Sequence, residues 1–211
     1  MVMKRARVWL LAAAGALAIG LVILFVVLAA PKGVLTPPAP SQALLNVAQG
    51  LDDVRIQATF DPVRRTLSVS QTMTLQNRTG EAQRLLILRA WANAFQSEEH
   101  SPIATDEVYD DCYPNGFSAG GVTLKTLTAA PAGGEAQAVT YVVGDAAQTV
   151  LRVSLPADWP AGGTLTLAAS YEVLIPQAAY RFGENGGIWA LGNVFLTPAP
   201  YVDGAYRTDD Y

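Results

Sequence analysis

Histidine and cysteine are almost missing from this chain of 211 residues, which has one of each, His100 and Cys112. A single histidine excludes any metal or catalytic site that would need two or three histidines from this chain, and the zinc-protease motif H-E-x-x-H does not occur. A lone cysteine cannot form an internal disulfide, so stability has to come from an apolar core. We expect Cys112 to be a half-buried free thiol, with pairing between chains as the alternative.

Charge is missing altogether from one long segment near the N-terminus. Val8 to Ala30 is an uninterrupted run of 23 apolar or small residues, preceded by Lys4, Arg5 and Arg7. A helix of that length rises about 34 Å, enough to cross a bilayer core of about 30 Å. The sequence predicts a cytoplasmic basic tail over 1–7 and a transmembrane helix over 8–30, with the lipid bilayer as its partner. A cleaved signal peptide is the alternative, and both interpretations place the rest of the chain outside the cytoplasm.

The part of the chain after the apolar run has an excess of acidic residues. It contains 11 lysines and arginines against 18 aspartates and glutamates, a balance of −7. This charge makes nucleic acid an unsuitable partner. Residues 31–50 contain four prolines and read as a spacer, with Gln42–Gln49 as a helix candidate. Residues 51–211 are long enough for one extracytoplasmic domain.

Alternation of apolar and polar residues predicts a mostly β fold for residues 51–211. In Thr66–Gln76 every second residue is apolar or Gln71, and the pattern returns in Leu165–Ile175. Shorter strand candidates, separated by turn sequences, are Val54–Phe60, Leu85–Trp91, Gly121–Leu127, Ala138–Val143, Thr149–Leu155 and Ile188–Leu196. Strands at this spacing predict an antiparallel β-sandwich or a saddle-shaped sheet.

The segment from Ala92 to Ala119 is acidic and shows little periodicity, which predicts a long loop. A metal site built from Glu98, Glu99, His100, Asp110 and Asp111 is an alternative to a solvated acidic loop. Asn77-Arg78-Thr79 fits a glycosylation sequon, but its position between two strand candidates favours a turn.

Three segments, in their order along the chain, resemble one protein family. The first contains Asp61-Pro62, a long alternating strand and Trp91-Ala92-Asn93-Ala94-Phe95; the second is Tyr113 to Val122; the third contains Arg181 to Asn185, Leu191-Gly192-Asn193 and the turn at Pro198 to Tyr201. Together they are similar to the strand-rich N-terminal domain of membrane-anchored bacterial zinc metallopeptidases of the aminopeptidase N-like family. The resemblance covers roughly Leu51 to Tyr211.

The resemblance implies a non-catalytic domain that packs against a zinc-containing catalytic domain and helps to wall a cleft for peptides. The H-E-x-x-H motif and the G-x-M-E-N loop of the family do not occur in this chain, so no catalytic or metal residue is carried over and no cofactor is expected within it. Glu184, Asn185 and Asn193 are the candidates for an interface or for the substrate side, and turn-forming roles are the alternative. If a catalytic domain is missing, an exposed apolar patch is expected near Asn193 to Tyr201.

Two other functions are consistent with the sequence. The first is a stand-alone, membrane-anchored β-sandwich that serves in binding or adhesion, with Trp91, Trp159 and Trp189 available for a binding face. The second is an independent enzyme that uses the acidic segment around Asp106 to Asp111.

Overall fold

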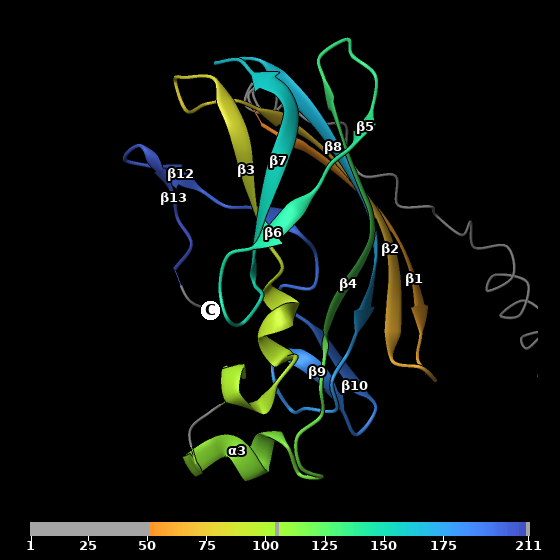
Figure 1. Cartoon of the computed structure of the whole chain (residues 1–211). Helices are drawn as coiled ribbons and strands as arrows, with labels where there is room; N and C mark the ends of the chain where they lie inside the picture. The colour runs from red at the N-terminus through yellow and green to blue at the C-terminus, as the bar shows by residue number, and fades with distance from the viewer. Residues whose placement is uncertain (1–50, 104–105, 210–211) are drawn as a thin grey trace, which may run out of the picture. The chain divides into compact units, whose positions relative to one another are not determined.

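The computed structural model describes residues 51–103 and 106–209, which belong to one compact unit (Figure 1). The expected basic tail, the transmembrane helix over Val8–Ala30 and the spacer with its helix candidate Gln42–Gln49 lie outside the described residues. Within the described ranges, no helix has the length and apolar character needed to cross a membrane.

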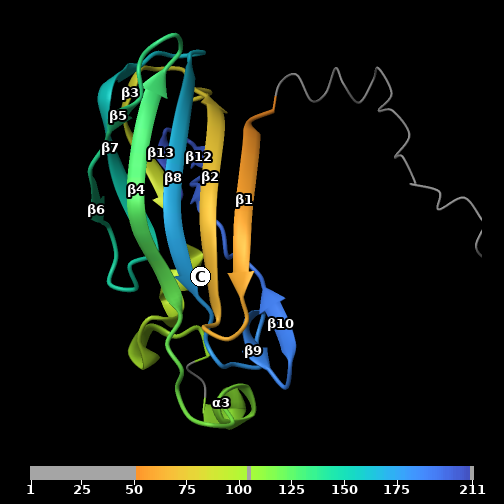
Figure 2. The ribbon, with the colours of Figure 1, turned by 90° about the vertical axis from the view of Figure 1, so that its right-hand side faces the viewer.

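The larger sheet has five antiparallel strands in the order β1-β2-β8-β4-β5. The strands are β1 Asp53–Asp61, β2 Thr66–Gln76, β8 Thr164–Leu174, β4 Gly121–Pro131 and β5 Gln137–Ala138. The central strand β8 pairs with β2 over eleven residues and with β4 along its other edge. Figure 2 shows this sheet from its outer face, with β1 at one edge.

A second sheet of four strands has the order β11-β3-β7-β6, and two separate hairpins lie before and after β11 in the chain. Its strands are β11 Thr197–Pro198, β3 Gln83–Arg89, β7 Val150–Trp159 and β6 Tyr141–Val143. The hairpins are β9 Phe182–Asn185 with β10 Ile188–Leu191, and β12 Tyr201–Val202 with β13 Ala205–Tyr206. The predicted mostly β, antiparallel fold is therefore confirmed for the described residues.

The apolar core lies between the two sheets. Met73 on β2 and Leu167 on β8 face each other in register, and both belong to the same buried cluster as Leu88 on β3 and Val153 on β7. The alternate residues of β2 and β8 are mostly serine and threonine, and they lie on the outer face shown in Figure 2. Period-two alternation thus separates a buried face from a solvated one.

Strand β1 differs from its neighbour because it is uncovered on both faces. Val54, Ile56 and Phe60 pair with Met73, Gln71 and Leu67 and so point to the inner side of the sheet, yet all three are exposed. Strand order explains the difference, because β1 is the last strand of its sheet and the described part of the four-stranded sheet does not extend over it.

The segment from Ala92 to Ala119 is not the unstructured loop that the sequence predicted. It contains two 3₁₀ turns, η1 Trp91–Phe95 and η2 Glu98–His100, and the helix α3 Asp106–Cys112. These elements are too short to produce a readable helical period, which explains why the sequence did not indicate them. Cys112 is half-buried, as expected, and has no disulfide partner among the described residues.

Two predicted strands end earlier than the sequence indicated. β3 ends at Arg89 because Trp91 begins the first 3₁₀ turn, and β10 ends at Leu191, two residues before Asn193. Asn193 has φ of 57°, in the left-handed region, which strand backbone does not adopt.

Candidate functional site

The β9–β10 hairpin carries two of the three residues predicted from the sequence. Glu184 on β9 pairs with Trp189, and its carboxylate accepts a hydrogen bond from the backbone N–H of Gly187 at 2.9 Å. Asn185 is exposed at the end of β9 and pairs with Ile188. The turn itself contains Gly186 and Gly187, both with positive φ, as a tight hairpin turn requires.

Asn193, the third predicted residue, lies after β10 in a tight bend. The backbone N–H of Gly192 donates to the carbonyl of Arg181 at 2.7 Å, and the left-handed backbone at Asn193 then redirects the chain. Asn193 itself is exposed. The structure therefore gives Glu184 and Asn193 roles in shaping turns, and it leaves Asn185 exposed at the hairpin tip.

The segment Asn193 to Tyr201, where an apolar patch was expected, is only partly buried: Thr197 and Pro200 are exposed, and the end of the segment lines a hollow together with Leu86 and Trp159. Val194, Leu196 and Ala199 are all 5% exposed or less. Polar groups of the sheet hold the segment in place: the Gln71 amide donates to the carbonyl of Leu196 at 2.8 Å, and the Tyr171 hydroxyl donates to Gln71 Oε1 at 2.5 Å. Burial raises the pKa of Tyr171 to about 12, so this hydroxyl stays protonated at neutral pH.

Exposed apolar side chains also lie at the β9–β10 hairpin. Ile188 is 76% exposed and Leu191 is 39% exposed, while the Trp189 ring makes an edge contact with Phe60 on β1 at 4.7 Å between ring centroids. We call Phe60, Ile188, Trp189 and Leu191 the hairpin patch; Trp189 and Leu191 lie on one face of β10 and Ile188 on the other, because successive side chains of a strand alternate. Figure 2 shows the hairpin beside the end of β1, so the patch joins two segments that are far apart in sequence.

The acidic segment does not form a metal site among the residues that the structure describes. No three histidine, cysteine, aspartate or glutamate side chains come together there in a way that could hold an ion. Glu98 instead accepts a hydrogen bond from the Tyr109 hydroxyl, which raises the pKa of Tyr109 to about 12. His100 lies away from these groups, in a hollow with Asp145 and Thr149.

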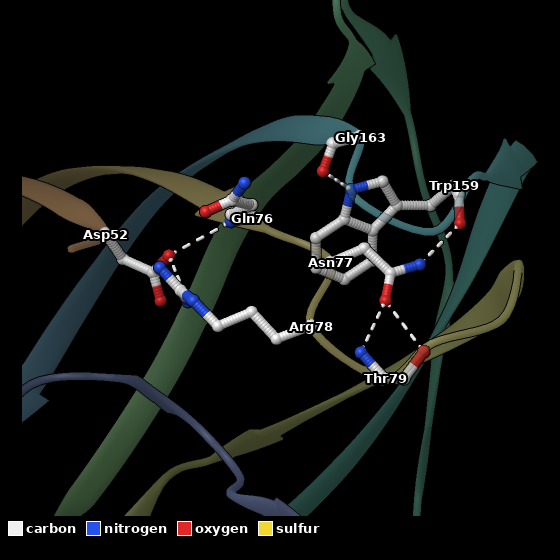
Figure 3. Close-up of polar contacts among 7 residues, drawn as sticks. All are labelled: Asp52, Gln76, Asn77, Arg78, Thr79, Trp159 and Gly163. Carbon is white, nitrogen blue, oxygen red and sulfur yellow. Dashed lines mark hydrogen bonds and ion pairs between the residues drawn. The ribbon is translucent and has the colours of Figure 1, made fainter. Parts of the chain in front are cut away.

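Asn77, the residue of the sequon, is buried in the turn between β2 and β3, where both ends of its amide group are hydrogen-bonded (Figure 3). Its amide nitrogen donates to the carbonyls of Glu81 at 2.8 Å and Trp159 at 2.7 Å. Its Oδ1 accepts from the backbone N–H of Thr79 at 3.0 Å and from the Thr79 hydroxyl at 2.7 Å. An amide nitrogen held in this way has no room for a glycan, and the turn interpretation fits the structure.

One motif with chemical meaning escaped the sequence reasoning. The segment from Gly116 to Gly120 matches the G-x-S-x-G motif of a nucleophile elbow. In such an elbow a strand leads through a sharp turn into a helix. Here the motif follows helix α3 and leads into strand β4, so the order is reversed. Ser118 Oγ accepts a hydrogen bond from the backbone N–H of Gln177 at 2.8 Å, which is a loop-fixing role.

Comparison of the sequence with protein-family models and with curated proteins finds no match in either set.

Proposed function

We propose that this chain is the non-catalytic N-terminal part of a membrane-bound, zinc aminopeptidase-like protein, whose catalytic domain packs against it outside the cytoplasm. The hairpin patch is the observation that carries the proposal. The hairpin exposes Ile188 on one face and Leu191 on the other, next to the segment where Trp189 contacts Phe60, and a second domain packed there would cover this apolar surface. Two of the residues that the family resemblance selects, Glu184 and Asn185, lie on this same hairpin.

The residues of the hairpin have the properties of a surface that packs against a second domain and borders a cleft. Apolar side chains on β10 would supply the buried centre of a domain interface, and the exposed amide of Asn185 would lie at its polar rim. Zinc would be held by the catalytic domain, where it activates a water molecule for attack on a peptide bond. The role of this chain is then to hold that domain near the membrane and to border the path of peptides.

Antibody capture tests the proposal with the protein as cells make it. An antibody against residues 53–209 should retain, from a detergent extract of the source membranes, an aminopeptidase activity that a metal chelator abolishes. When the cells carry Ile188→Asp, heating should inactivate the retained peptidase several-fold faster, because the substitution would bury a charge in the interface.

Val63→Asp is the matched control, since Val63 is 91% exposed in the β1–β2 turn and should leave heat resistance unchanged. Capture of the chain without any chelator-sensitive peptidase would contradict the proposal and would favour the stand-alone binding or adhesion module. Equal effects of Ile188→Asp and Val63→Asp would contradict the part assigned to the hairpin patch.

A further inference from the structure

Strand β1 leaves one of its two edges without a partner strand among the described residues. It is the terminal strand of the five-stranded sheet and pairs with β2 alone. The pairing runs through nine consecutive residue pairs, from Asp53 with Thr74 to Asp61 with Thr66, without a bulge. Figure 2 shows this regular strand standing at the margin of the sheet.

The edge of β1 lacks several of the features that normally prevent strand pairing, although three of its nine residues, Asp53, Arg55 and Asp61, are charged. Edge strands are usually protected by short length, bulges, proline or charged side chains, most often lysine. β1 has nine residues and contains neither proline nor lysine. Its one cation, Arg55, already forms an ion pair with Asp53 at 3.0 Å. Ile56 and Phe60, about 40% exposed, add an apolar side to this open edge.

We propose that β1 pairs antiparallel with β1 of a second copy of this chain, around a twofold axis at Ala58. The sequence of the strand is complementary to itself in this register. Arg55 lies opposite Asp61 of the partner subunit, and Ile56 lies opposite Phe60 of the partner subunit. Directly opposed pairs of unlike charge and of apolar side chains both stabilise antiparallel sheets. Each pair occurs twice because the interface is symmetric.

The neighbouring registers are less favourable. A twofold axis at Gln57 places Asp53 opposite Asp61 of the partner subunit, and like charges directly opposite destabilise a sheet. An axis at Ile56 places Phe60 opposite Asp52 of the partner subunit, a carboxylate that is already bonded to Arg78 at 2.9 Å. The register at Ala58 thus places unlike charges and apolar side chains opposite each other, with Asp61 also accepting from the backbone N–H groups of Val63 and Arg64.

The pairing also extends apolar packing that the single chain begins. Phe60 already contacts the Trp189 ring on one side. In the dimer, Ile56 of the partner subunit would lie beside Phe60. One apolar cluster would therefore form at each end of the two paired β1 strands. This inference does not rest on the proposed function, and because the dimer would cover Phe60, it leaves Ile188 and Leu191 as the part of the hairpin patch available to a catalytic domain.

Cysteine cross-linking of the full chain in detergent tests the register. In a Cys112→Ser background, Ala58→Cys places two thiols directly opposite each other, close to the separation that a disulfide requires. Val54→Cys is the matched control on the same face of the same strand, since its two thiols would be about 26 Å apart along the paired strands. We expect Ala58→Cys to form covalent dimers at least tenfold faster than Val54→Cys.

Sedimentation of the unmodified chain gives an independent measurement. The full chain should have twice its monomer mass, and Ile56→Lys should shift it to the monomer, while Val63→Lys, outside the strand, should not. A monomeric unmodified chain would overturn the proposal, as would cross-linking through Ala58→Cys no faster than through Val54→Cys.

Discussion

Asn77→Ala should lower the free energy of unfolding by about 3 kcal/mol, because it leaves buried polar groups without partners. The carbonyl of Trp159 loses its donor and the backbone N–H of Thr79 loses its acceptor, while the carbonyl of Glu81 keeps only the Thr79 hydroxyl. Asn77 is only 2% exposed, so water cannot easily replace these bonds. Urea unfolding of the full chain in detergent, followed by tryptophan fluorescence, measures the change, since Trp159 lies beside the turn (Figure 3).

Arg78→Ala is the matched control in the same turn. The Arg78–Asp52 ion pair is largely open to solvent, and exposed pairs contribute less than about 1 kcal/mol. A loss of stability below about 0.5 kcal/mol for Asn77→Ala, or equal losses for the two variants, would contradict the role of Asn77 as the buried centre of the turn.

Leu167→Ala should lower the free energy of unfolding by about 2 to 5 kcal/mol, the usual cost of a large cavity in a packed core. Leu167 is fully buried at the middle of β8, between Met73 on β2 and Ala129 on β4, which are also fully buried. The flanking strands are held by their own ladders, so the space left by the side chain cannot collapse completely. The same urea titration measures the loss.

Thr166→Ala tests whether β8 presents the faces described above. Thr166 is the preceding residue and lies on the outer face, so its loss should cost less than about 1 kcal/mol. Similar costs for Leu167→Ala and Thr166→Ala would show that the larger sheet does not bury one face and solvate the other.

The fold of the sheets could be predicted from the sequence where a period of two is long enough to read. Strand β2 has the predicted bounds Thr66–Gln76, and β8 differs from its predicted bounds by one residue at each end. Both predictions were this accurate because eleven alternating residues can bury their apolar side in only one register. Strand order is not encoded in such a pattern. The sequence therefore could not reveal that Val54 and Ile56 of β1, which alternate like core residues, would lie uncovered at an edge.

The burial of Val194 and Leu196 could not be predicted for a related reason. Val194 and Leu196 lie in a segment without regular structure, and tertiary hydrogen bonds to Gln71 and Tyr171 bury it. One signal was available: Gln71 is a polar residue at an inward position of an apolar strand, and a buried amide requires a partner. That partner, the carbonyl of Leu196, is 125 residues away in sequence. No local pattern identifies a partner at that distance.

Reading the coding sequence beyond the codon for Tyr211 tests the central claim most directly. If this chain is the front part of a zinc aminopeptidase-like protein, an H-E-x-x-H motif with a downstream glutamate ligand should follow in the same reading frame. A stop codon directly after Tyr211, with no peptidase captured by the antibody described above, would contradict the claim.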